Sequence, residues 1–274
     1  MKSDKSKVSR RAVLSGVGVA ALGAGMARVP FNTAVASDTL PSLPWDYAAN
    51  GLDVDEIRIQ AFCLDQQVNC GYGGAQAIIN ALADQVGEPW SALPDGLYSY
   101  AGGGVLKWGT ICGSLNGIIA VMGMLGVHGK LGDALMDYYC TADLPTPTLE
   151  GCTPDCVSEP LPAVVTSVAA SPLCHMSVSK WADTQGVPIS DPLKKVRCGR
   201  LVGDIAARAV ELMNDYFLYG IVPVAWVPQE EYADCFLCHT EPDVVPSQVG
   251  KMDCVQCHDV TKNHEKPGKY KGNK

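Results

Sequence analysis

Two short motifs near the end of the chain combine cysteine and histidine at a spacing that could carry chemistry. Both have the form C-x-x-C-H, and their residues are Cys235, Cys238, His239, Cys254, Cys257 and His258. Two thiols about one helical turn apart can add to the two vinyl groups of haem, and the adjacent imidazole can then bind the iron. The motifs therefore predict two covalently attached haem c groups per chain.

Two other uses of these cysteines were weighed against haem attachment. The four thiols could form a zinc ribbon, or they could form disulfides in an oxidising compartment. Either use would leave His239 and His258 without a role. Haem attachment is therefore the favoured interpretation.

Each haem iron also needs a distal ligand, and the chain has few candidates. We predict bis-histidine ligation, with His175 and His264 as the distal ligands. Met176 and Met252 compete with them, and a methionine ligand would raise the haem potential. His128 is interpreted as a capping or surface residue at a helix C-terminus.

The two motifs lie close together in the sequence, because only the 14 residues 240–253 separate them. Such a short connection predicts two neighbouring haems. The 44 residues 231–274 are too few to cover two macrocycles alone. This segment must therefore pack on the preceding domain or on a second subunit, which makes a homodimer the expected assembly.

Eight further cysteines precede these motifs, and their pattern leaves three interpretations open. They could form four disulfides, remain unpaired core thiols, or bind a metal centre. Cys112 and Cys198 open predicted buried helices, where the helix dipole and free N–H groups stabilise thiolates. An iron–sulfur or related site is therefore favoured for this set, which comprises Cys63, Cys70, Cys112, Cys140, Cys152, Cys156, Cys174 and Cys198.

The first 36 residues have the order of a bacterial export signal. Arg10 and Arg11 precede an apolar run over residues 12–27, and Ala34-Val35-Ala36 follows. The twin arginine indicates the Tat route, which exports folded proteins and suits a metal centre inserted beforehand. The alternative, a membrane anchor, would need a longer and more apolar run. We therefore expect a periplasmic protein without a membrane span in the mature chain.

The composition and the hydrophobic periodicity together predict a mainly α-helical protein. With 47% hydrophobic and 18% charged residues, a disordered or fibrous chain is excluded. Helices are predicted over 75–86, 112–126 (buried all round) and 201–219, with an extended loop over 140–174. We expect a helical cysteine domain over 37–230 and a small, loop-rich dihaem segment over 231–274. Residues beyond 36 carry a net charge of -13, from 15 basic and 28 acidic residues, which disfavours nucleic acid as a partner.

These features resemble a known family. The motif Asn69-Cys70 before Ala75-Gln76, followed by Cys112-Gly113, resembles the C_GCAxxG_C_C proteins. With Cys174-His175 and the two C-x-x-C-H motifs, the mature chain is similar to the split-Soret cytochromes c of sulfate-reducing bacteria. This chain departs from the family pattern after Cys70, where four residues precede Ala75.

The resemblance implies a periplasmic homodimer with two haems stacked at one end of each subunit and bis-histidine ligation. One distal ligand would come from the other subunit. It also implies an iron–sulfur site in the cysteine domain, with Cys112, Cys174 and Cys198 as ligands and Cys70 as the fourth. The cysteines that could replace one of these four ligands are Cys140, Cys152 and Cys156.

Electron transfer is the predicted function, because six-coordinate haem iron has no open position for a substrate. The alternative is a reductase that works at the cysteine domain and uses the haems as its electron supply; a haem-based sensor ranks last. The redox partner is not identified by the sequence. A lysine-rich tail could steer an acidic partner or simply be solvated, and it contains Lys262, Lys266, Lys269, Lys271 and Lys274.

Overall fold

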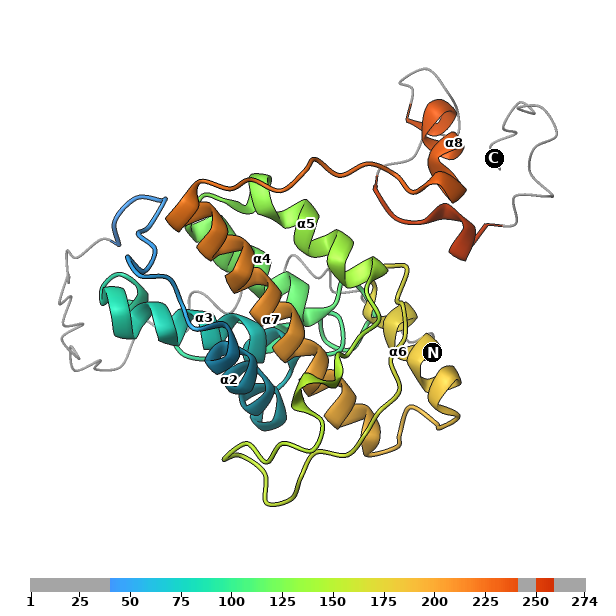
Figure 1. The fold of residues 1–274 in the computed structure, drawn as a ribbon, viewed down its shortest axis with the longest axis horizontal. Helices are drawn as coiled ribbons and strands as arrows, with labels where there is room; N and C mark the ends of the chain where they lie inside the picture. Colours follow the sequence, from blue (N-terminus) through green and yellow to red (C-terminus); the bar gives the residue numbers. More distant parts are fainter. Residues whose placement is uncertain (1–39, 241–249, 259–274) are drawn as a thin grey trace, which may run out of the picture. The chain divides into compact units, whose positions relative to one another are not determined.

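Helices account for the regular structure of the chain, which is known here from a computed structural model that describes residues 40–240 and 250–258 (Figure 1). The α-helices are α2 (Val54–Gln67), α3 (Cys70–Val86), α4 (Gly113–Met124), α5 (His128–Thr141), α6 (Cys174–Gln185), α7 (Leu193–Tyr219) and α8 (Glu230–His239). Short 3₁₀ helices are η1 (Trp90–Ala92), η2 (Ser99–Ala101), η3 (Pro147–Leu149) and η4 (Cys254–Gln256). Within these residues there are two isolated β-bridges and no strand, which confirms the predicted mainly α class.

Helix α7 is the centre of the fold, and α2, α3, α4 and α5 all contact it (Figure 1). Its apolar side chains are fully buried along one face, among them Val202, Ile205 and Val210. This confirms the helix predicted over 201–219, which begins eight residues earlier, at Leu193. It ends at Gly220, whose left-handed conformation (φ 68°) stops the helix.

Helix α3 confirms the prediction over 75–86 and extends it back to Cys70. The side chain of Asn69 accepts hydrogen bonds from the backbone N–H groups of Gly71 and Tyr72, which caps the helix. Gly73 lets α3 approach α2, because a Cβ there would lie 2.7 Å from the Ala61 carbonyl oxygen. The two helices therefore pack backbone to backbone, and Cys70 is held at a helix N-terminus.

Helix α4 confirms the prediction over 112–126, with Cys112 as its N-cap. It is not buried all round, as had been expected, because Ile119, Ala120 and Gly123 are only half-buried and line a shallow surface groove. His128 is exposed, as predicted for a surface residue, but it begins α5 and does not end a helix. The reason is that Gly126 (φ 70°) already turns the chain out of α4.

The loop between α5 and α6 confirms the extended segment predicted within 140–174, and buried charges hold it to α7. Asp204 of α7 accepts hydrogen bonds from the Thr146 backbone N–H (2.6 Å) and hydroxyl (2.8 Å), and it pairs with Arg58 of α2. Arg200 donates to the carbonyl oxygens of Thr146 (2.7 Å) and Pro162 (3.1 Å). One buried polar network therefore joins α2, α7 and both ends of the loop.

One disulfide also ties this loop to the helices. Cys63 of α2 is bonded to Cys156, with the two Cα atoms 5.6 Å apart. The alternative of four disulfides is therefore wrong, since the other six cysteines of that set are free. Cys156 is likewise excluded as a substitute metal ligand, because its sulfur is already bonded.

Cys63→Ser is expected to lower the free energy of unfolding by about 2–4 kcal/mol, because the bond closes a loop of 93 residues. Urea unfolding without reductant measures this change. Cys152→Ser is the matched control, since Cys152 is a free, exposed cysteine of the same loop and should leave the stability nearly unchanged. Equal effects of the two variants would contradict the prediction.

Several sequence predictions concern residues outside those described. They are the export signal over 1–36, the distal-ligand candidate His264 and the basic tail; the side chain of Cys238 is likewise not described. Among the helices of the described part, none has the length and apolar character needed to cross a membrane.

Candidate metal centres

The four cysteines predicted as cluster ligands come from four different helices of the fold. Cys70 opens α3, Cys112 caps α4, Cys174 opens α6 and Cys198 lies in the second turn of α7. The charge of Cys112 acts on each of the other three thiols. We call these four residues the cysteine site. Cys198 was predicted to open its helix, which is wrong because α7 already begins at Leu193.

Cys70 and Cys112 are neighbouring thiols whose mutual hydrogen bond shifts their pKa values in opposite directions. The pKa of Cys112 is lowered, first by the hydrogen bond from Cys70 and then by Ser114, whose hydroxyl lies 3.3 Å from the sulfur. The pKa of Cys70 is raised by the same bond and by burial. Cys112 therefore carries the negative charge, as expected at a helix N-terminus.

A glycine makes this pairing sterically possible. A Cβ at Gly113 would lie 2.6 Å from the Cys70 sulfur and 2.8 Å from the Gly71 backbone nitrogen. No other residue fits there without moving α3 away from α4. Gly113 therefore belongs to the architecture of the site, although it contributes no side chain.

The thiols of Cys174 and Cys198 both have a raised pKa. Burial raises the pKa of Cys174 to about 12, and the negative charges of Cys112 and Cys198 add to the increase. Burial also raises the pKa of Cys198, against the favourable charge of Arg197. Among the described residues, no three His, Cys, Asp or Glu side chains lie close enough together to hold one metal ion.

Buried hydrogen-bond donors without partners surround this site. Arg197 is 1% exposed and donates from Nη2 to the Ser177 hydroxyl (2.8 Å), while its Nε and Nη1 have no acceptor. The Tyr139 hydroxyl is a buried donor without a well-formed hydrogen bond, and Cys112 and Ser177 lie beside it. The sequence analysis missed both residues. Only the position of Arg197 next to Cys198 could have indicated it.

Asp65 is a third residue near the site that the sequence did not indicate. It is 2% exposed, and its carboxylate lies 3.2 Å from the Lys195 ammonium. Burial raises its pKa to about 6, an effect that Lys195 only partly offsets. Asp65 is therefore largely neutral in mildly acidic solution, which limits the negative charge beside the cysteine site.

This shift has a measurable consequence in the iron-free protein. Because Asp65 binds its proton more tightly in the folded state, stability should fall as the pH rises from about 4 to about 6. Asp65→Asn should lack this part of the pH dependence. Urea unfolding of both proteins across this range tests it, and a constant difference between them would contradict the assignment.

The two C-x-x-C-H motifs both adopt helical turns and lie side by side. Cys235 and Cys238 are one turn apart in α8, which ends at His239. In the second motif, the backbone N–H of His258 donates to the Cys254 carbonyl oxygen (3.0 Å). The pKa of the Cys254 thiol is raised by burial and by the neighbouring charge of Cys235. The two motifs are therefore neighbours in the structure, as their short separation in the sequence predicts.

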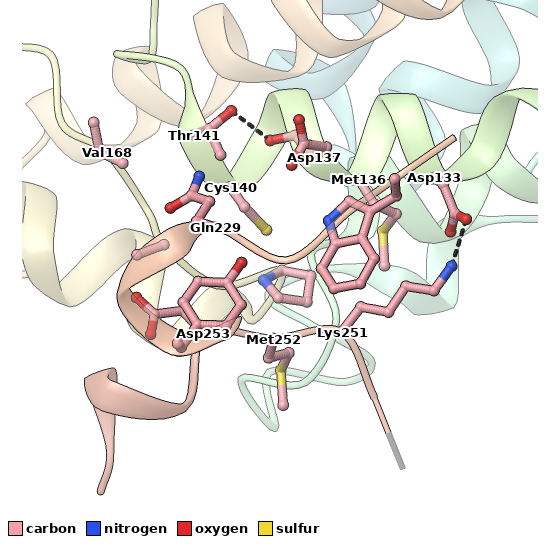
Figure 2. Close-up of a pocket in the computed structure, with 14 residues that line it drawn as sticks. Asp133, Met136, Asp137, Cys140, Thr141, Val168, Gln229, Lys251, Met252 and Asp253 are labelled. Atoms are coloured by element: carbon pink, nitrogen blue, oxygen red, sulfur yellow. Dashed lines mark hydrogen bonds and ion pairs between the residues drawn. The ribbon is translucent and has the colours of Figure 1, made fainter. Parts of the chain in front are cut away.

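A cavity of about 230 Å³ separates α5 from the segment that carries these motifs (Figure 2). Met136 and Cys140 line it from α5, and Trp226 and Met252 line it from the C-terminal segment. Lys251 closes one side, because it pairs with Asp133 of α5 and lies 5.4 Å above the Trp226 ring. Cys140, one of the alternative cluster ligands, thus lines this cavity. Cys152, another alternative ligand, lies on the α5–α6 loop.

The distal-ligand candidates occupy different places. His175 is exposed in the first turn of α6, against Gly109, and does not line the cavity. Lys180 of the same helix donates to Gln256 of the second motif, so α6 lies beside that motif. Met176 is one turn before Lys180 on the same face. Met252 faces the cavity, and its sulfur accepts a hydrogen bond from the Ser171 hydroxyl (3.9 Å).

Comparison with known proteins finds relatives that match most of this chain. The family model described as "Putative redox-active protein (C_GCAxxG_C_C)" matches residues 72–212, a span that includes Cys112, Cys174 and Cys198 and begins just after Cys70. The chain is 32% identical over 198 residues to the split-Soret cytochrome c of Desulfovibrio desulfuricans, covering 70% of this chain and 69% of that protein. A solved structure of split-Soret cytochrome c from the same species, reported with a novel iron centre, matches with a TM-score of 0.68 and 26% identity, covering 80% of this chain and 91% of that one. The chain therefore belongs to the split-Soret cytochrome c family and contains a domain of the C_GCAxxG_C_C type.

Proposed function

We propose that the protein is a dihaem c-type cytochrome that transfers single electrons through two closely spaced haems, with an iron–sulfur centre at the cysteine site. Membership in the family supports the general redox role. The observation that carries the finer proposal is the contact between the two C-x-x-C-H turns, where Cys254 lies beside Cys235. Haems attached to adjacent turns must themselves be neighbours.

The residues of the C-terminal segment fit the haem c chemistry. Cys235, Cys238, Cys254 and Cys257 would attach the two groups, and His239 and His258 would bind the irons from one side. The Asp253 carboxylate holds the second turn by accepting from the Val255 N–H (2.9 Å) and from Gln256 (2.6 Å). When bound, haem iron supplies a one-electron couple. His175 and His264 are the proposed distal ligands.

The residues of the cysteine site fit an anionic iron–sulfur cluster better than a single ion. A single ion needs all its sulfur ligands within about 2.3 Å, and the described side chains offer no such set. A cluster spreads its thiolate ligands apart and brings acceptor sulfides with it. The unpaired donors of Tyr139 and Arg197 are the groups that such acceptors would satisfy.

Contacts between the two centres support electron exchange within one chain. Ser171 donates to Met252, just before the second haem motif. Pro172 follows Ser171, and its carbonyl oxygen accepts from the Cys112 backbone N–H (2.9 Å). A short series of covalent and hydrogen bonds therefore runs from the C-terminal segment to the cysteine site.

We also propose that the protein is exported by the twin-arginine route and acts as a periplasmic homodimer. The Arg10-Arg11 signal supports the location. The small size of the haem-bearing segment and the exposure of His175, which could then ligate a haem of a second subunit, support the dimer. Sedimentation analysis of the haem-loaded protein tests the assembly, and an Arg10→Lys, Arg11→Lys variant retained in the cytoplasm would support the route.

The decisive experiment is the visible spectrum of the purified protein, oxidised and reduced, with a pyridine haemochrome count. We expect two haems c per chain, low-spin spectra and a reduced Soret band divided in two. His175→Ala should convert one haem to a high-spin form, whereas His128→Ala should not. A protein without covalent haem would overturn the proposal. The motifs would then be interpreted as a zinc site or as disulfide-forming cysteines.

A further inference from the structure

We infer that Arg197 and Tyr139 are the residues that set the reduction potential of the iron centre, by donating hydrogen bonds to it from within the protein. The inference rests on the proposed iron–sulfur centre and goes beyond it, because neither residue is a metal ligand. Two independent observations support it: both residues are fully buried, and both carry donor atoms that no acceptor in the protein satisfies.

The guanidinium of Arg197 is held in place by its surroundings. Its Nη2 donates to the Ser177 hydroxyl (2.8 Å), and its central carbon lies 5.9 Å from the centre of the Trp181 ring. Ser177 and Trp181 are themselves buried and belong to α6, the helix that Cys174 opens. The two remaining donors, Nε and Nη1, are therefore left in a fixed position with no partner.

The position of this cation points to a negatively charged ligand. Its charge acts on Cys174, Cys198 and Tyr139, which are parts or neighbours of the cysteine site. No carboxylate pairs with Arg197 among the ion pairs of the described residues. A buried, unpaired cation is strongly unfavourable, so an anion must compensate it in the loaded protein. Cluster sulfides and cysteine thiolates are such an anion.

Tyr139 adds a neutral donor on the α5 side of the same site. Its hydroxyl is next to Cys112, the cysteine that carries the charge of the thiol pair. It also lies beside Ser177, and it belongs to α5, whereas Arg197 belongs to α7. A hydroxyl that is buried without a partner costs stability, and a sulfur acceptor at the centre would remove that cost.

The redox consequence follows from charge alone. One-electron reduction adds one negative charge to the centre and requires no proton or further reactant. A fixed cation and oriented donors stabilise the more negative, reduced form and raise the potential. Removing them should therefore favour the oxidised form.

Arg197→Met tests the role of the cation, because it keeps a long side chain and removes the charge. The equilibrium constant for reduction of the iron centre should fall about tenfold or more, and each factor of ten corresponds to about 59 mV for a one-electron couple. EPR-monitored redox titration of the haem-loaded protein measures it. Arg197→Lys should shift the potential less. Arg208→Met is the matched control, since Arg208 lies on the same helix but is paired with Glu211 (2.7 Å) and partly exposed.

A second readout separates tuning from a purely structural role. Without iron, Arg197 has no carboxylate partner and two of its donors lack acceptors, so Arg197→Met should change the melting temperature of the iron-free protein little. It should lower that of the iron-loaded protein. Equal losses in both forms with an unchanged potential would overturn the inference.

Tyr139→Phe keeps the test decisive if the Arg197 variants fail to fold, because it removes only one hydroxyl. We expect a smaller shift in the same direction, with iron content retained. An unchanged potential in Tyr139→Phe would remove Tyr139 from the inference. A wild-type protein that binds no iron would instead overturn the proposed centre itself, and the inference with it.

Discussion

Replacing Cys254 and Cys257 by alanine is expected to remove one of the two haems and leave the other attached. The second motif forms its own 3₁₀ turn, apart from α8, which carries Cys235. Attachment at one turn therefore does not require the other. The pyridine haemochrome count should fall by half, and the divided Soret band should become single because the remaining haem has no close neighbour.

A matched control distinguishes this loss from a general effect of removing cysteines. The double variant Cys140→Ala and Cys152→Ala also removes two free thiols, but both lie outside the C-x-x-C-H motifs. It should keep the full haem count and the divided band. A full count after loss of Cys254 and Cys257 would show that the second motif does not carry haem.

Asp204→Ala is expected to cause the largest loss of stability, about 3–5 kcal/mol in the free energy of unfolding. Asp204 is 3% exposed and compensates Arg58, which it contacts directly. It also accepts two hydrogen bonds from Thr146, where the α5–α6 loop begins. The variant would leave a mostly buried guanidinium without its buried carboxylate and the Thr146 backbone N–H without its acceptor. Urea unfolding measures the loss.

The control uses the other carboxylate near the same arginine. Asp55 lies 4.0 Å from Arg58 but is 87% exposed, so Asp55→Ala should cost less than about 1 kcal/mol. Similar losses for the two variants would mean that the buried network does not hold the loop. Because Asp204 is remote from the C-x-x-C-H motifs in sequence, the haem count should be unchanged in the folded fraction of both variants.

The helices were largely predictable because their signals are local. The periodicity of residues 201–219 and the stop at Gly87 are visible in the sequence, and both agree with the structure. The starts were less predictable. Helix α3 begins at Cys70 because Asn69 caps it, and the approach of Gly73 to the α2 backbone, which a propensity scale does not register, holds its first turns in place.

The errors have different origins. The helix-end position predicted for His128 is wrong because Gly126, a local signal, already ends α4, and His128 opens α5. The Cys63–Cys156 bond joins residues 93 positions apart, and spacing alone cannot identify such a pair. Only the disulfide depends on contacts between distant parts of the chain.

By itself, the sequence determined the mainly helical class, the family resemblance and the two C-x-x-C-H motifs, because each rests on residues within a few positions of one another. Only the tertiary structure decided that Cys70, Cys174 and Cys198 feel the charge of Cys112, and that Arg197 and Tyr139 lie beside them with unsatisfied donor atoms. The physical reason is that burial, charge compensation and hydrogen-bond satisfaction are properties of packed helices that are distant in sequence.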